Sequence, residues 1–268
     1  MSVLLFEKRG HIAYVTLNRP EARNAINPEL VVRLAETWHE IDRDAAIRAA
    51  IVTGAGDKAF CAGADLARLI PLFSGARPAE DEWDRQVTEK PSLVGAALLR
   101  DFNPDKPLIA AINGFCIAGG LELVQGTDLR VASQTATFAL QEVRWAILPS
   151  AGSMVRMPRQ MPYCKAMEIL LTGNRIDAAE AYRLGFVNYV TPPGEVMAKA
   201  QELAERITEN GPLAVRAIKR TVLSALGRPL DEGYRMEDEA TREVMRTEDA
   251  KEGPRAFIEK RKPRYVGR

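Results

Sequence analysis

The chain has 268 residues, of which 46% are hydrophobic and 27% are charged, and its formal net charge is +1. This length suits one large domain or two small ones, and the composition is typical of a soluble globular protein. A nearly neutral chain has no global positive field, which disfavours a nucleic acid or an anionic membrane as a partner. The N-terminus mixes acidic and basic residues and no segment is apolar enough to cross a bilayer, so we expect a cytoplasmic protein.

Cysteine and histidine are scarce. Cys61, Cys116 and Cys164 are widely spaced and form no CxxC pair, which predicts reduced thiols and disfavours a zinc site. The two histidines, His11 and His39, lie in regularly patterned segments. This placement disfavours a histidine-based catalytic triad or metal site.

Strands and helices alternate in the first half of the chain. Residues 3–8 and 11–17 alternate in polarity on either side of an Arg-Gly pair and predict a β-hairpin. Pro28 opens a helix, in which apolar residues recur at helical spacing: Leu30, Leu34, Trp38 and Ile41. Residues 66–104 are patterned as irregular helix with a polar break at 74–81. Further strands are expected at 49–53, 107–112, 128–133 and 137–140.

Helices dominate the second half. The apolar spacing predicts them at 166–171, 178–184, 195–209, 212–226, 231–247 and 250–260. The alternation of strand, loop and helix before this region predicts an α/β core. The helical C-terminal part either covers that core or packs against another subunit.

Two of the strands end in glycine-containing loops that lead into helices. The sequence CAGAD (61–65) follows the strand at 49–53, and NGFCIAGG (113–120) follows the strand at 107–112. Glycine lets a backbone N–H group approach a ligand, and a helix N-terminus supplies free N–H donors. Two such loops could direct two N–H groups at one carbonyl oxygen and form an oxyanion hole. Alone, each loop also fits an ordinary turn, and neither has the spacing of a phosphate-binding loop.

Two glutamates lie in apolar surroundings after these features. Glu122 comes three residues after Gly119, so on a helix that begins there the two share one face. Glu142 follows the apolar strand at 137–140. Burial would raise the pKa of both carboxyl groups and suit them to proton transfer near neutral pH. The alternatives are a solvent-facing helix residue for Glu122 and a local ion pair with Arg144 for Glu142.

Four segments in order resemble the crotonase superfamily: LNRPEARNAI (17–26), AFCAGADL (59–66), INGFCIAGGLEL (112–123) and EGPRAFIEKRKP (252–263). The resemblance implies an α/β fold with ββα units coiled into a spiral core, over 1–195, and a helical trimerisation region over 196–268. It implies an acyl-CoA thioester substrate, no metal and no cofactor beyond the coenzyme A of the substrate. It also implies a homotrimer or a dimer of trimers.

The resemblance assigns roles to particular positions. Ala64 and Gly119 match the two oxyanion-hole donors, and Glu122 and Glu142 match the acid–base pair. The positions that match contacts to coenzyme A are Ala22, Ala62, Asp65, Leu66, Phe257 and Lys260. The last two can reach coenzyme A across a subunit boundary in this family.

The acid–base residues decide the reaction within the superfamily, and the presence of both glutamates favours an enoyl-CoA hydratase. We expect Glu122 to deprotonate water and Glu142 to protonate C2, although coupled titrations allow exchanged roles. The alternatives are an enoyl-CoA isomerase, an acyl-CoA hydrolase, a specialised dehydratase such as a carnityl-CoA dehydratase, and a CoA-binding protein with little catalysis.

The sequence departs from the family pattern at three places. Ala118 stands where many members have glycine, and Ser150 and Ser153 stand in a loop that often reads PGAGG. The stretch between Asp65 and Glu122 is longer than in short-chain hydratases. Since loops carry specificity, these differences predict a remodelled acyl pocket and a bulky or unusual acyl group.

Overall fold

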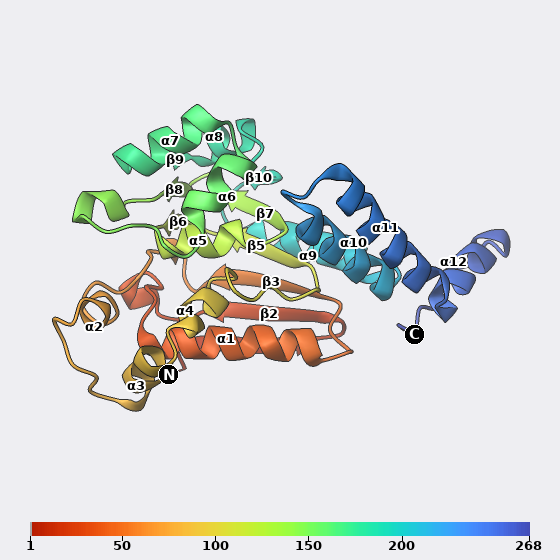
Figure 1. Cartoon of the computed structure of the whole chain (residues 1–268), viewed down its shortest axis with the longest axis horizontal. Coiled ribbons are helices and arrows are strands. Elements are labelled where there is room, and N and C mark those ends of the chain that lie inside the picture. Colours follow the sequence, from red (N-terminus) through yellow and green to blue (C-terminus); the bar gives the residue numbers. More distant parts are fainter. Residues whose placement is uncertain (1) are drawn as a thin grey trace.

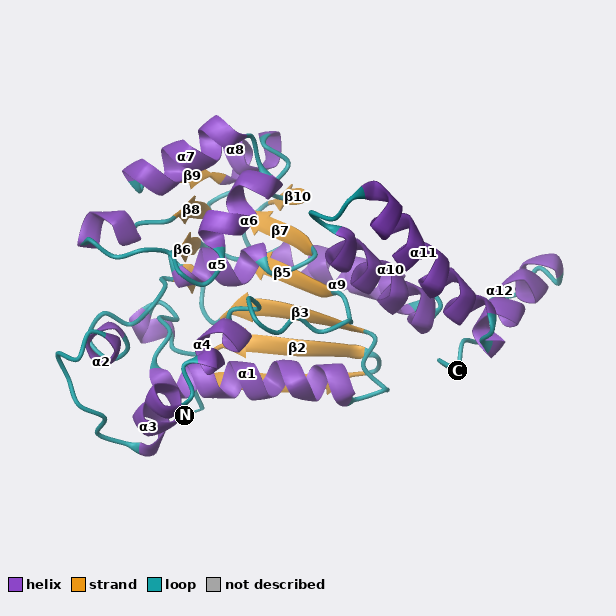
Figure 2. Cartoon of the chain, in the orientation of Figure 1, coloured by secondary structure: helices purple, strands orange, loops and turns teal. Residues whose placement is uncertain are grey.

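The computed structural model describes residues 2–268 and contains two β-sheets, one of six strands and one of four (Figures 1 and 2). The larger sheet has the strand order β1-β2-β3-β5-β7-β10. The first two strands form an antiparallel hairpin, as predicted, and the others pair in parallel. Its strands are β1 (Leu4–Arg9), β2 (Ile12–Leu17), β3 (Ala49–Gly54), β5 (Leu108–Ile112), β7 (Leu129–Ser133) and β10 (Tyr189–Thr191).

The smaller sheet has the order β4-β6-β8-β9, and its first three strands are parallel. Its strands are β4 (Ala59–Cys61), β6 (Phe115–Ile117), β8 (Thr137–Ala139) and β9 (Ile176–Asp177). Consecutive strands alternate between the sheets, because β3, β5 and β7 belong to the larger sheet and β4, β6 and β8 follow them in the smaller one. Helix α5 (Gly119–Gln125) follows β6. These are the expected ββα units of an α/β core.

Helix α1 (Pro28–Arg43) covers one face of the larger sheet and begins at the predicted proline. The side chain of Asn27 caps the helix by accepting a hydrogen bond from the Leu30 N–H group at 3.0 Å. The predicted apolar stripe is fully buried, as Trp38 illustrates. The Trp38 indole N–H donates to the Ala97 carbonyl at 2.9 Å and so joins α1 to α4. The expected irregular region consists of α2 (Ile70–Phe73), α3 (Glu82–Glu89) and α4 (Ser92–Ala97).

Helix α9 (Val196–Thr208) covers the other face of the larger sheet. Its apolar residues pack against the side chains of Ile51, Ile109 and Val131 on β3, β5 and β7. Helix α9 begins at the domain boundary expected after residue 195, but it packs against the larger sheet as part of the core. The division into two domains therefore remains a prediction. Between β8 and α9 lie η2 (Glu142–Trp145), α6 (Ser153–Gln160), α7 (Tyr163–Thr172) and α8 (Ala178–Arg183).

The last three helices extend away from the sheets (Figure 1). They are α10 (Pro212–Ala225), α11 (Leu230–Met245) and α12 (Glu248–Ile258). No residue of α11 is buried. The C-terminal segment folds back, since the carboxylate of Asp249 accepts hydrogen bonds from the N–H groups of Val266 and Gly267.

The sequence did not predict β4, β6, β9, β10 or α6. These four strands have only two or three residues each, too few to show an alternating pattern. Helix α6 has a polar sequence with Pro158 inside it. The three cysteines are free, as predicted. No helix within residues 2–268 is both long and apolar enough to cross a membrane.

Candidate active site

The candidate catalytic residues follow the carboxyl ends of three neighbouring strands of the smaller sheet. Ala64 follows β4, Gly119 follows β6 and Glu142 follows β8. Because these strands are parallel neighbours, their carboxyl ends meet at one edge of the sheet. Such an edge is where open parallel sheets bind their ligands.

Two backbone N–H groups lie close together at this edge. A Cβ atom on Gly119 would lie 3.7 Å from the Ala64 nitrogen, and one on Gly63 would lie 3.3 Å from the Gly119 nitrogen. Within residues 2–268, neither the Ala64 nor the Gly119 N–H group donates a hydrogen bond to a protein acceptor. The pair can therefore serve one ligand oxygen as an oxyanion hole.

The residues just before these N–H groups have unusual backbones. Gly63 has φ +94°, and a Cβ atom there would lie only 2.6 Å from the Ala118 Cβ. Ala118 has φ 53° and ψ −127°, a combination that normally requires glycine. This conformation turns the chain from β6 into α5 immediately before Gly119. The strain therefore lies directly beside the proposed oxyanion donor.

Glu122 lies in the first turn of α5 and is only 5% exposed. Its Oε1 atom accepts hydrogen bonds from the N–H groups of Ala151, at 2.7 Å, and Ser153, at 3.4 Å. Burial raises the pKa of Glu122, and these N–H groups and the charge of Arg156 partly oppose the increase. The alternative of a solvent-facing helix residue is excluded by this burial.

Glu142 begins η2 and is 7% exposed. Its Oε2 atom has no hydrogen-bond partner in the part of the chain that the structure describes. Burial raises the pKa of Glu142 to about 7, and the negative charge of Glu122 adds to this increase. Arg144 donates instead to the Thr172 carbonyl and the Asn174 side chain, which excludes the local ion pair.

One cavity of about 330 Å³ contains both glutamates and both oxyanion-hole residues. Ala62 and Leu66, two of the predicted CoA contacts, also line it. The guanidinium groups of Arg23 and Arg175 both lie over the aromatic ring of Phe115, at 6.0 and 5.2 Å from the ring centroid. The remaining lining is mostly apolar and includes Ile26, Leu69, Ile70, Phe73, Val94, Leu98, Ile117, Trp145, Ile147 and Leu148.

The other predicted CoA contacts do not line this cavity. Ala22 is half-buried in the short helix η1 (Pro20–Ala22). The Asp65 carboxylate forms an ion pair with Arg19 at 3.0 Å and accepts hydrogen bonds from two following N–H groups, so it stabilises the loop. Phe257 is 85% exposed, and it and Lys260 lie in or just after α12, at the opposite end of the molecule from α2 (Figure 1). A single chain therefore does not bring these two residues to the cavity.

Several site residues were not predicted. The Ala151 and Ser153 N–H groups that hold Glu122 are backbone atoms, which the sequence does not reveal. Phe73 and Trp145 are solvent-exposed aromatic residues that line the cavity, and their exposure in irregular segments is the signal that could have identified them. Among residues 2–268, no cluster of three or more His, Cys, Asp or Glu side chains is placed to hold a metal ion.

A sequence model of one family, described as enoyl-CoA hydratase/isomerase, matches residues 7–268. The chain belongs to this family. The finding confirms the predicted superfamily, the α/β fold class and the assignment as an enzyme.

Relatives of the enoyl-CoA hydratase/isomerase family match this chain along nearly its full length. Enoyl-CoA hydratase EchA19 of Mycobacterium tuberculosis is 44% identical, over 98% of this chain and 96% of the relative. A carnitinyl-CoA dehydratase of Citrobacter koseri is 38% identical, over 99% and 98% respectively. The crystal structure of enoyl-CoA hydratase from Bacillus anthracis superposes with a TM-score of 0.90 at 36% identity, covering 99% of this chain and 100% of that one.

Proposed function

We propose that the protein is an enoyl-CoA hydratase that adds water across the 2,3 double bond of a 2-enoyl-CoA thioester. The observation that carries this proposal is the presence of two buried glutamates, Glu122 and Glu142, in one cavity with two backbone N–H groups that donate to no acceptor within residues 2–268. Hydration needs one group to accept a proton from water, another to protonate carbon, and an electrophilic site for the thioester oxygen. The cavity has a candidate for each of these roles.

In the proposed reaction the thioester oxygen accepts hydrogen bonds from the N–H groups of Ala64 and Gly119. Glu122 takes a proton from water while the water oxygen forms a bond to C3. The π electrons move through C2 to the thioester oxygen and give an enolate. Glu142 then delivers its proton to C2, so that the product contains one added water molecule.

The surroundings of the two carboxyl groups support this division of roles. Two N–H groups donate to Glu122, and such donors stabilise a carboxylate, the form that a base requires. Glu142 has an unpartnered oxygen and a pKa raised to about 7, so near neutral pH a large fraction of it carries the proton that an acid must deliver. The pair would titrate as a coupled system.

The alternative of a specialised dehydratase is tested by the charge of the cavity. A carnityl group carries a permanent positive charge. The charged residues that line the cavity are the two glutamates and two cationic residues, Arg23 and Arg175. No further carboxylate is present there to balance a cationic acyl group, which favours an uncharged substrate.

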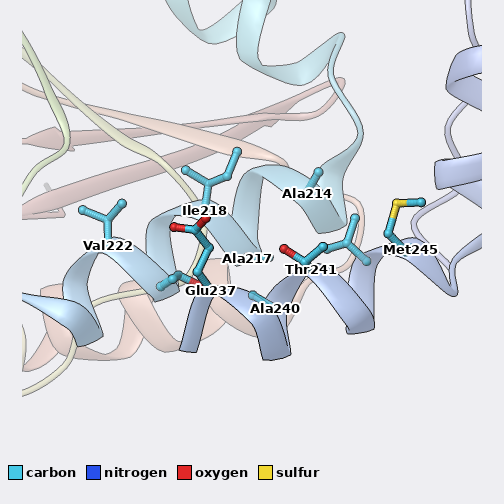
Figure 3. Close-up of a pocket in the computed structure, with 10 residues that line it drawn as sticks. Ala214, Ala217, Ile218, Val222, Glu237, Ala240, Thr241 and Met245 are labelled. Atoms are coloured by element: carbon cyan, nitrogen blue, oxygen red, sulfur yellow. The ribbon is translucent and has the colours of Figure 1, made fainter. Parts of the chain in front are cut away.

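We also propose that the chain assembles into a trimer or a dimer of trimers through its C-terminal helices. An apolar groove lies between α10 and α11, and Figure 3 shows the side chains that line it. Large apolar residues on these helices and in the turn between them are solvent-exposed in the single chain: Ile218, Val222, Leu223, Leu226, Leu230, Tyr234 and Met245. An exposed apolar surface of this kind is typical of a protein–protein interface. Such an assembly is required for Phe257 and Lys260 to reach a CoA molecule, which would have to be bound by a neighbouring subunit.

The function is tested by incubating the purified protein with crotonyl-CoA and longer 2-enoyl-CoA thioesters. Loss of the absorbance of the conjugated thioester, with formation of the 3-hydroxyacyl-CoA, is the expected result. No turnover at any chain length would reject the hydratase assignment. Light scattering tests the assembly: a mass of three or six chains is expected, and the mass of one chain would contradict it.

A further inference from the structure

Part of the cavity lining is apolar and open to solvent. It is formed by α2 and by η2 with the residues that follow it. Phe73 on α2 is 47% exposed. Trp145 at the end of η2 is 64% exposed, and Leu148, three residues later, is 67% exposed. Exposed aromatic and aliphatic side chains that border a cavity are typical of a surface that a ligand covers.

The charged groups of the cavity lie elsewhere in its lining. Arg23 and Arg175 gather around Phe115, the first residue of β6, and neither has a carboxylate within ion-pair distance in the described part of the chain. The α2–η2 surface contains no charged side chain apart from Glu142 itself. The lining therefore separates a cationic region, which suits the phosphates of coenzyme A, from an apolar region, which suits an uncharged acyl group.

The α2 wall is held in place from outside the cavity by ion pairs. Asp84 is fully buried, and its carboxylate accepts from Arg77 at 2.6 Å. Arg77 also donates to the Arg68 carbonyl at 2.8 Å, just before α2, and Arg68 pairs with Asp81 at 2.9 Å. Arg68 and Arg77 thus form their ion pairs and hydrogen bonds away from the cavity, while Ile70 and Phe73 line it. A wall fixed in this way can select substrates by shape.

We propose that the surface between α2 and η2 binds an uncharged apolar acyl group longer than crotonyl, with Phe73, Trp145 and Leu148 as the specificity-determining contacts. The proposal rests on the proposed hydratase function, because it takes the reacting carbons to lie between Glu122 and Glu142. The continuity of this surface with the cavity of the two glutamates favours the acyl group over a second protein chain as the occupant.

The test is the specificity ratio, defined as kcat/KM for 2-octenoyl-CoA divided by kcat/KM for crotonyl-CoA. Each additional methylene that is buried should raise kcat/KM by about fourfold, so the ratio should be on the order of 10². Phe73→Ala and Trp145→Ala should each lower it by about tenfold. Tyr182→Ala serves as the matched control, because Tyr182 is a similarly exposed aromatic residue that does not line the cavity. It should leave the ratio unchanged.

A wild-type ratio near one, or a ratio that neither alanine variant changes, would overturn the proposal while leaving the hydratase function intact. If Trp145→Ala lowers the mass measured by light scattering without changing the ratio, the surface is a subunit contact and the proposal is wrong. Phe73→Leu and Trp145→Leu replace the alanine variants if these do not fold, and they too should lower the ratio.

Calorimetric titration with butyryl-CoA and octanoyl-CoA separates this proposal from the hydratase assignment, since saturated thioesters cannot be hydrated. If no enoyl-CoA is hydrated but octanoyl-CoA binds more tightly than butyryl-CoA, and Trp145→Ala removes the difference, the acyl site stands and the hydratase function falls. Equal affinity for the two thioesters would overturn the acyl site.

Discussion

Glu142→Gln should make the folded protein more stable at alkaline pH. Burial raises the pKa of Glu142 from 4.5 to about 7, so the folded protein binds this proton more tightly than the unfolded chain does. The resulting stabilisation is complete below the unfolded pKa and is lost as the pH rises through the folded pKa. The two pKa values differ by an amount worth roughly 3 kcal/mol, at about 1.4 kcal/mol for each pKa unit. Between about pH 5 and pH 8 the native protein should lose roughly 2–3 kcal/mol that the glutamine variant keeps.

The assay is urea-induced unfolding, followed by circular dichroism near pH 5 and near pH 8 at one fixed protein concentration, because assembly would otherwise change the apparent stability. Glu89→Gln, which replaces an exposed glutamate at the end of α3, is the control and should change stability by less than about 0.5 kcal/mol at either pH. If the free energy of unfolding of Glu142→Gln differs from that of the native protein by the same amount at both pH values, burial does not destabilise the Glu142 carboxylate and the inference is wrong.

Three further variants test the surroundings of the site. Ala118→Gly should raise the free energy of unfolding by about 1 kcal/mol, because glycine relieves the strain of φ 53° and ψ −127°; thermal unfolding measures this, and a loss of stability would contradict it. Arg156→Met should move the acidic limb of the pH profile of kcat/KM to higher pH, because the positive charge of Arg156 helps to lower the pKa of Glu122; an unmoved limb would show that this charge has no effect. Arg130→Met should lower the free energy of unfolding, measured in urea, by roughly 3 kcal/mol or more. The buried guanidinium donates to carbonyl groups at and just beyond the C-terminal end of α5, and the variant leaves these carbonyls without a partner. A loss below about 1 kcal/mol would reject this role.

Much of the fold followed from patterns of sufficient length. The stripe from Leu30 to Ile41 identified α1 because it repeats with the period of a helix. The short apolar runs identified β3, β5 and β7, because parallel strands buried on both faces are apolar along most of their length. The strands β4 and β6 did not emerge, since three residues in a glycine-containing stretch show no period. These two strands nevertheless place Ala64 and Gly119, so the smaller sheet that forms the site was the least predictable part of the core.

The candidate site was predictable in part. The sequence predicted a helix after the second glycine loop, and on a helix that begins at Gly119 it expected Gly119 and Glu122 to share one face. The helix does begin at Gly119, and both residues are buried. The sequence could not decide whether Glu142 is paired with Arg144, because that depends on how η2 packs against α7 and the loop after it. It also could not show that Ala151 and Ser153 hold Glu122 through their backbones, since the contact joins residues far apart in the chain and uses no side chain of the loop.

The central claim is that Glu122 and Glu142 together perform acid–base chemistry on a bound acyl-CoA. The most direct measurement is kcat for hydration of a 2-enoyl-CoA by Glu122→Gln and by Glu142→Gln, together with calorimetric binding of octanoyl-CoA to the same variants. Each substitution should lower kcat by about 10²-fold or more, while the affinity for octanoyl-CoA stays within about threefold of the native value because glutamine preserves the shape of the side chain. A variant that keeps near-native kcat, or loses binding as much as it loses rate, would contradict the account.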